Sequence, residues 1–193
     1  MEVFFDQVAA IYEGLAQNMD PFMQAALCRP GCSLCCSGPG RIDISTLEGL
    51  KILQHINSLP SGIRQKMWKS VARDCRNREQ EKKTCCPFLR KNHTCAIYEI
   101  RPLVCRRLYS LEPCKSRGAV LHKEAVALGA EARDALQRLD INGYSGHISY
   151  ILHLLEEPGF RSFYAAGGFD PSLVMVYGRK HKLVIHRSLH GKK

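Results

Sequence analysis

The sequence predicts a mainly α-helical protein whose helices support irregular, cysteine-rich loops. Three observations predict this class: apolar residues recur at helical spacing in several segments, all ten cysteines fall between Cys28 and Cys114, and glycine and proline interrupt the cysteine runs. With 193 residues and 45% hydrophobic content, the chain is long enough to bury its own core. We therefore expect one domain over 1–193, with a cysteine-rich metal-binding region at 28–114 and a helical support region with a basic tail at 115–193.

Helices are expected on both sides of the first cysteines. Residues 3–17 carry apolar side chains at helical spacing, and Asp20-Pro21 is typical of an N-cap followed by proline, so two short helices should precede Cys28. Ser45-Thr-Leu-Glu48 is a capping box, in which each side chain bonds the other residue's backbone N–H. It predicts a helix over about 46–58.

A further apolar stripe follows Pro60 and predicts another helix. Its members recur every four residues: Ile63, Met67, Val71 and Cys75. We therefore interpret Cys75 as a small core residue rather than as a ligand.

The elements after this helix are shorter. Two extended segments around a polar turn are predicted at 86–89 and 95–98, which should bring Cys86 and Cys95 together. Pro102 is expected near the start of a helical turn that carries Cys105. Amphipathic helices are predicted at 122–139 and 147–155, and a short C-terminal β-hairpin from 173–177 and 183–186.

The cysteines form two groups in the sequence, which is the pattern of a thiolate metal site. Short C-x2-C spacings supply two ligands from one turn, and a distant group supplies the rest of the coordination shell. The first group lies at 28–36, and the second lies at 85–114. Because Cys35 and Cys36 are adjacent, their side chains should diverge, giving either two ligand sets or one ligand beside a structural thiol.

The expected cellular compartment favours cysteines that act as metal ligands over cysteines that form disulfides. The N-terminus has no basic segment followed by an apolar run, and no apolar run approaches the roughly 18–20 residues of a membrane span. We therefore expect a cytoplasmic protein without a membrane partner. In a reducing cytosol, clustered thiols are ligands or redox groups more often than disulfides.

The joint pattern resembles a known family. Cys28-x3-Cys32-x2-Cys35-Cys36, followed by Cys86-Pro-Phe-Leu, Cys95-Ala-Ile-Tyr and Arg101-Pro-x2-Cys105-Arg, is similar to the bacterial CxxCxxCC cysteine-cluster family of zinc- or iron-chelating domains over about residues 5–115. The cysteine region of flagellin N-methylase, a protein lysine-methylating enzyme, is similar as well.

The resemblance implies a ligand set. The first spacing is x3 rather than x2, Cys114 corresponds to a later family cysteine, and Cys75 and Cys85 have no counterpart. The implied metal ligands are Cys28, Cys32, Cys35, Cys36, Cys86, Cys95, Cys105 and Cys114.

The formal charge of +10 has an explanation near these thiols. A four-thiolate site with a divalent metal carries −2, so two such sites would lower the net charge to +6. Arginines that could offset this charge stand near the cysteines: Arg29, Arg101, Arg106 and Arg107. Arg101 and Arg106 could instead pair with Glu99 or cap a helix. We interpret the other basic residues, at 64–83 and from Arg179 to Lys193, as solvated surface, which makes a nucleic-acid partner unlikely.

Histidine adds little to the expected ligand set. Only His93, in the turn between Cys86 and Cys95, is near enough in sequence to be a candidate, and we interpret it as a hydrogen-bonded turn residue.

Spacing does not choose the metal, because zinc and a [4Fe-4S] cluster can use the same four thiolates. The first hypothesis is a metal-binding protein that holds zinc or iron, with a [4Fe-4S] cluster as one form, and a protein partner as an option. The alternatives are a protein lysine N-methylase-like enzyme with a cysteine-ligated cluster and a nucleic-acid-binding zinc module. The chain has no Gly-rich nucleotide loop for S-adenosylmethionine, so the enzyme is disfavoured.

Overall fold

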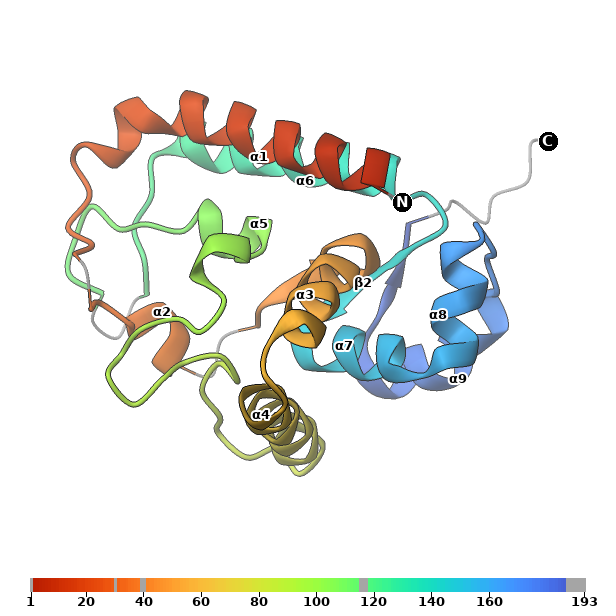
Figure 1. The fold of residues 1–193 in the computed structure, drawn as a ribbon. Helices are drawn as coiled ribbons and strands as arrows, with labels where there is room; N and C mark the ends of the chain where they lie inside the picture. Colours follow the sequence, from red (N-terminus) through yellow and green to blue (C-terminus); the bar gives the residue numbers. More distant parts are fainter. Residues whose placement is uncertain (1, 30, 39–40, 115–117, 187–193) are drawn as a thin grey trace.

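The fold of this computed structural model is mainly α-helical with one small sheet (Figure 1). The structure describes residues 2–29, 31–38, 41–114 and 118–186. The longer helices are α1 (Glu2–Met23), α3 (Thr46–Ser58), α4 (Ser61–Glu79), α6 (Lys123–Leu139), α7 (Ile148–Glu156), α8 (Pro158–Ala165) and α9 (Pro171–His181). Single turns form α2 (Leu34–Ser37), η1 (Tyr98–Ile100) and α5 (Leu103–Arg106). Within these residues, no helix combines the length and apolarity needed to cross a membrane.

The helices α1 and α6 lie side by side and form one layer of the molecule (Figure 1). Val8, Tyr12, Leu15 and Met19 of α1 are buried at helical spacing and pack in the same cluster as Leu136 of α6. The expectation of two helices before Cys28 was wrong, because α1 continues through Pro21. Pro21 lies in the last turn, where its missing N–H costs the helix only one hydrogen bond before it ends.

The second layer is built around a three-stranded antiparallel sheet. Its strands are β1 (Asp43–Ser45), β2 (Tyr144–His147) and β3 (Val184–Ile185), in the order β1-β2-β3. Ile44 pairs with Gly146, and Ser145 pairs with Val184. Helices α3 and α7 pack closely, since a Cβ atom at Gly49 would lie 2.7 Å from Ile151 and from Leu155. Any larger residue at this crossing would force the Ile151 and Leu155 side chains to shift.

Several sequence predictions are confirmed. The capping box has both of its hydrogen bonds and starts α3, the stripe after Pro60 lies in α4, and the two amphipathic segments form α6 and α7. The hairpin at 173–177 and 183–186 was wrong in its first arm, which lies within α9. Asp170 accepts a hydrogen bond from Ser172 N, and Pro171 occupies the first turn, so a capped helix start replaces the strand. The second arm is β3, which pairs with β2. The basic tail at 187–193 lies outside the described residues.

A buried carboxylate fixes α4 to α7. Asp74 accepts hydrogen bonds from Arg78 Nε at 2.9 Å, Thr84 Oγ1 at 2.7 Å and Ser149 Oγ at 2.6 Å. His147 Nδ1 lies 3.6 Å from the same carboxylate and accepts from Ser149 N. Burial, together with the charge of Arg78, holds the pKa of His147 well below its ordinary value.

This burial predicts acid sensitivity. In the unfolded chain His147 takes up a proton as pH falls through about 6.5, whereas in the folded protein the buried ring stays neutral. The contribution of His147 to the free energy of unfolding is therefore fully present above that pH and is lost progressively below it. Relative to His147→Asn, which retains an acceptor for the helix cap, the protein should lose up to about 1.4 kcal/mol per pH unit. Urea unfolding at several pH values measures this difference. His153→Asn, at an exposed histidine, is the matched control and should follow the unsubstituted chain. Parallel pH profiles for the unsubstituted chain and His147→Asn would contradict the prediction.

Candidate metal centre

The first cysteine group lies between α1 and β1. Leu27 N donates to Ser110 O at 2.8 Å, which brings this loop next to the segment that leads to Cys114. Arg29 Nη1 donates to Ala26 O and Cys28 O, at 2.7 and 3.0 Å, and so fixes the turn that carries Cys28. The single turn α2 then carries Cys35 and Cys36, whose sulfur atoms are 3.8 Å apart.

The second cysteine group meets α2 through the backbone. Cys86 N donates to Cys36 O at 2.8 Å, and Cys85 Sγ donates to Ser37 O at 3.3 Å. Cys95 forms a single β-bridge with Leu89, so the predicted turn does return the chain. The two extended segments predicted around it were wrong, because Leu89 N donates to Cys86 O in a turn and η1 begins at Tyr98. The bonds to Cys36 and Ser37 hold the two cysteine groups together.

A buried carboxylate positions the third segment of the site. Glu48 Oε1 accepts from Leu103 N at 2.7 Å and from Tyr12 OH at 2.7 Å, while its Oε2 accepts from Ser45 N at 2.8 Å. The start of α5, and with it Cys105, is thereby tied to α1 and α3. The capping box signals the bond to Ser45, but the sequence carries no signal for the other two donors.

The thiols act on one another electrostatically. Burial raises the pKa of Cys105 to about 12, with contributions from the charges of Cys36, Cys95 and Cys35. Contact with Cys35 lowers the pKa of Cys36, but contact with Cys86 and burial raise it, with a net value of about 11. Thiols from both cysteine groups therefore lie within electrostatic range of one another.

Cys28 is influenced by a different set of thiols, which we call its neighbourhood. Burial raises its pKa, a hydrogen bond to the Ser110 backbone lowers it, and the charges of Cys32, Cys114 and Cys35 raise it again. The charge of Cys35 also raises the pKa of Cys95, which burial raises most. Cys35 is thus the thiol that acts on members of both neighbourhoods.

Cys75 stands apart from this cluster. Its Sγ donates to Ser149 O at 3.3 Å, and burial raises its pKa to about 12, with the charge of Asp74 as the next cause. No cysteine is among the groups that act on it. This placement agrees with its interpretation as a half-buried core residue.

Two of the three other candidates, His93 and Arg106, are accounted for by local contacts. His93 Nδ1 lies 3.0 Å from Ser33 Oγ, as expected for a hydrogen-bonded turn histidine. Arg106 donates to Arg101 O at 2.8 Å and to Glu99 O at 2.6 Å, so it braces carbonyls rather than pairing with the Glu99 carboxylate. Arg101 differs, because its charge lowers the pKa of Cys95 and its buried Nε has no hydrogen-bond acceptor among the described residues.

The donor set fits zinc or iron by its chemistry, since soft thiolates are the ligands that both prefer in such sites. All ten cysteines are free thiols. Among the described residues, no group of three or more His, Cys, Asp or Glu side chains is already arranged to hold a metal ion. Binding would therefore require the thiols to close around the ion.

The comparisons with known proteins agree with this donor chemistry. The model of the CxxCxxCC family, described as "Putative zinc- or iron-chelating domain", matches residues 27–127. This range contains all eight of the cysteines proposed as ligands. No curated protein and no solved structure matches the chain.

The hydrogen bonds to Glu48 predict that its carboxylate holds the start of α5, although Glu48 is not a proposed ligand. Glu48→Gln should lower the free energy of unfolding by about 2–3 kcal/mol, because buried N–H and O–H donors lose a charged acceptor. Hydrogen exchange should accelerate at Leu103–Arg106, where α5 begins. Glu99→Gln, at an exposed carboxylate, is the matched control. Unchanged exchange at α5 in Glu48→Gln would show that the carboxylate does not hold this turn.

Proposed function

The chain belongs to the CxxCxxCC family, and on that premise we propose that it chelates zinc or iron through thiolates drawn from both cysteine groups. The observation that carries the proposal is the pair of hydrogen bonds that joins the two cysteine groups, from Cys86 N to Cys36 O at 2.8 Å and from Cys85 Sγ to Ser37 O at 3.3 Å. These residues come from separate segments that the chain holds together by hydrogen bonds. Cys86, Cys95 and Cys105 also pack against the core, but core packing does not account for the exposed Cys28, Cys32 and Cys35.

The proposal extends to two adjacent four-thiolate sites. One site would use Cys36, Cys86, Cys95 and Cys105, and the other would use Cys28, Cys32, Cys35 and Cys114. Support comes from the charges of Cys36 and Cys95, which act on Cys105, and from those of Cys32 and Cys114, which act on Cys28. Cys35 acts on both, and we place it with Cys28 because the backbone of its neighbour Cys36 is bonded to Cys86. The vicinal pair would then give one ligand to each site, as its divergent side chains favour.

An all-thiolate shell also bears on the role of the metal. Hydrolytic metal centres keep an open position and usually use histidine or carboxylate ligands. Four thiolates close the shell around zinc or hold a [4Fe-4S] cluster, so we propose structural or storage chelation. Free thiols persist in a reducing compartment, and we propose the cytoplasm on that ground.

Metal content tests the division into two sites. Zinc-loaded protein should hold about two equivalents per chain, and Cys105→Ser and Cys114→Ser should each lose about one, because each removes a ligand from a different site. Cys85→Ser is the matched control, since it lies next to Cys86 and has no place in either set. Cys75→Ala should also retain the full content.

Elemental analysis and a visible absorption spectrum after anaerobic purification identify the metal, since zinc is colourless and an iron-sulfur cluster absorbs. Loss of all metal in both Cys105→Ser and Cys114→Ser would replace the two sites by one. Full metal content in both variants would overturn the proposed ligands altogether.

Metal removal under reducing conditions should loosen the cysteine loops first. Hydrogen exchange should lose protection mainly in residues 28–38 and 85–114, because thiolate bonds cross-link these irregular segments. Helix α6 should change less, since its buried residues pack against α1. Equal protection with and without metal would mean that the loops are preformed, which favours a reversible metal carrier over structural chelation.

A further inference from the structure

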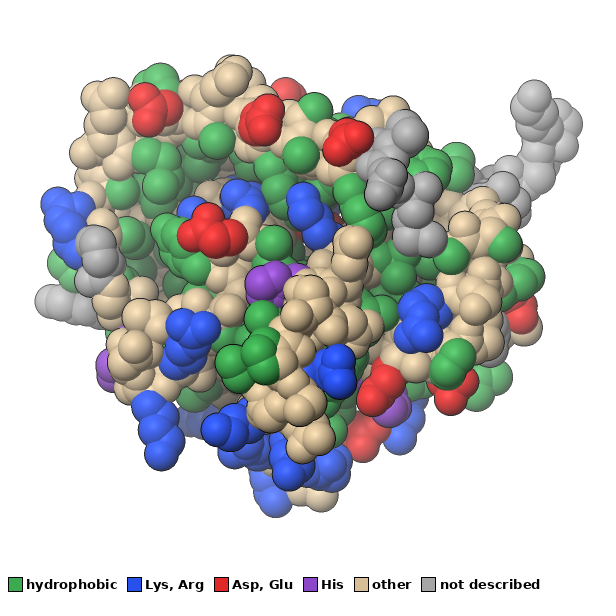
Figure 2. Space-filling view, in the orientation of Figure 1, with side chains coloured by type: hydrophobic (Ala, Val, Ile, Leu, Met, Phe, Trp, Pro, Cys, Tyr) green, Lys and Arg blue, Asp and Glu red, His purple; other side chains and the backbone are tan. Residues whose placement is uncertain are grey.

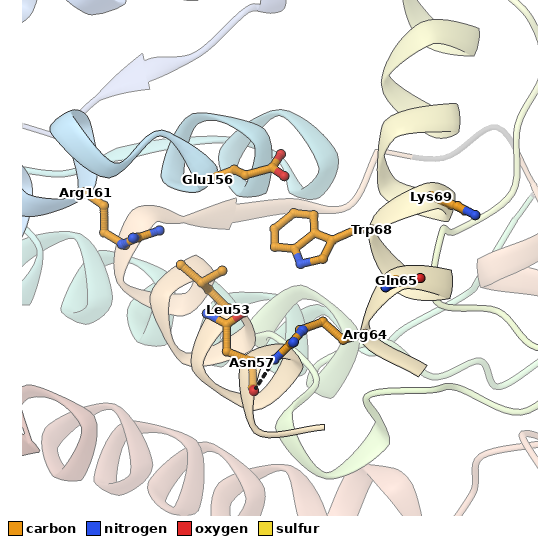
Figure 3. Close-up of a pocket in the computed structure, with 8 residues that line it drawn as sticks. All are labelled: Leu53, Asn57, Arg64, Gln65, Trp68, Lys69, Glu156 and Arg161. Atoms are coloured by element: carbon orange, nitrogen blue, oxygen red, sulfur yellow. Dashed lines mark hydrogen bonds between the residues drawn. The ribbon is translucent and has the colours of Figure 1, made fainter. Parts of the chain in front are cut away.

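A pocket of about 550 Å³ lies away from the cysteines, between α3, α4 and the junction of α7 with α8 (Figure 3). This volume falls within the roughly 300–1,000 Å³ of small-molecule sites. The pocket is lined by Leu53, Asn57, Arg64, Gln65, Trp68, Lys69, Glu156 and Arg161. None of these residues belongs to the proposed metal ligands.

A flat aromatic surface stands in this pocket. Trp68 extends from α4 toward Leu53 and Glu156, and its ring is only partly buried (Figure 3). Leu53 is 4% exposed and forms an apolar wall. An indole ring that remains accessible beside an apolar wall can stack against a planar ligand.

Two arginines of the lining are held in place by backbone carbonyls. Arg64 Nη1 donates to Asn57 O at 3.2 Å, and Arg161 Nη1 donates to Leu155 O at 3.1 Å. A guanidinium has five N–H donors, so one bond to a carbonyl orients the group and leaves other donors for an anion. In Figure 3, Arg161 reaches toward Trp68, whereas Lys69 points away from it.

The charges of the lining favour an anion. The lining contains three basic residues, Arg64, Lys69 and Arg161, and one carboxylate, that of Glu156. The pocket also borders a basic helix, because α4 carries Arg64, Lys66, Lys69, Arg73 and Arg76 in addition to Arg78, which bonds Asp74. Figure 2 shows Lys and Arg side chains gathered along the lower edge of the molecule, where Figure 1 places α4.

We propose that this pocket binds a nucleotide, with the base stacked on Trp68 and the phosphate bound by Arg161 and Arg64. Arginine recognises phosphate through paired N–H donors, and an aromatic ring accepts any base on its face. The Glu156 carboxylate repels phosphate but accepts hydrogen bonds from amino groups. It therefore directs the polar edge of the base toward itself and the phosphate toward the arginines.

The nucleotide could be a free mononucleotide or one unit of a single strand. A strand that extends beyond the pocket would also contact further basic residues of α4, such as Lys66 and Arg73, so its affinity should fall steeply with salt. A mononucleotide contacts only the pocket, and its affinity should depend weakly on salt. The salt dependence thus distinguishes the two sources.

Trp68 is the only tryptophan of the chain, so its fluorescence reports on this pocket. The metal-loaded full chain is titrated with AMP, GMP, inorganic phosphate and a single-stranded oligonucleotide about eight nucleotides long. Corrected for absorption by the base, the fluorescence should be quenched by the nucleotides and not by phosphate alone. Arg161→Gln should weaken binding about tenfold, as expected for the loss of a charge-assisted hydrogen bond.

Two controls accompany this titration. Arg133→Gln removes the same charge from an exposed arginine on α6 and should leave binding unchanged. Trp68→Leu, followed by calorimetry, should weaken nucleotide binding about tenfold, and Trp68→Phe should weaken it less, because phenylalanine still stacks. Metal content should be unchanged in every variant.

Four results would overturn the proposal: no quenching by any nucleotide or oligonucleotide, equal quenching by phosphate alone, equal losses in Arg161→Gln and Arg133→Gln, or equal competition by an acidic peptide. The first rules out the site, and the others reduce it to a non-specific anion or peptide surface.

Discussion

The carboxylate of Glu48 joins three segments of the chain at one buried point. Tyr12 comes from α1, Ser45 precedes α3, and Leu103 begins α5. Burying a carboxylate is costly unless donors surround it, and here three donors do so. Because α5 is only one turn long, it has little helical stability of its own. The orientation of Cys105 therefore depends on a contact made outside the cysteine segments.

Packing against the hydrophobic core explains why the thiols differ in exposure. Cys86, Cys95 and Cys105 are half-buried and pack against the cluster built from α3, α4 and α7. Cys28 and Cys32 are exposed in the loop after α1. One proposed site thus rests on a packed core, whereas the other depends more on its backbone turns and on the bond between Leu27 and Ser110. The two proposed sites are therefore held in place by different interactions.

Local rules predicted most of the helices, because their signals lie within a few residues of one another. The capping box at Ser45 and the stripe ending at Cys75 are of this kind. The segment 173–177 failed because its β-branched composition competed with the cap formed by Asp170 and Pro171. The eight proposed ligands could be chosen from spacing and resemblance. Their division into neighbourhoods could not, because it depends on contacts between residues that are far apart in the sequence, such as Cys28 and Cys114.

The arginines near the cysteines serve two different purposes. Arg29 and Arg106 donate hydrogen bonds to backbone carbonyls, and Arg106 also lies over the Tyr12 ring, 4.4 Å from its centroid. These residues shape the turns that carry cysteines. Arg101 is the one of the three whose charge lowers a thiol pKa, that of Cys95, although Arg90 contributes as well. Since a four-thiolate site carries net negative charge, a half-buried guanidinium beside it would stabilise the bound form. Positive charge in this region thus acts chiefly through backbone structure, with Arg101 the residue best placed to act on the thiolates themselves.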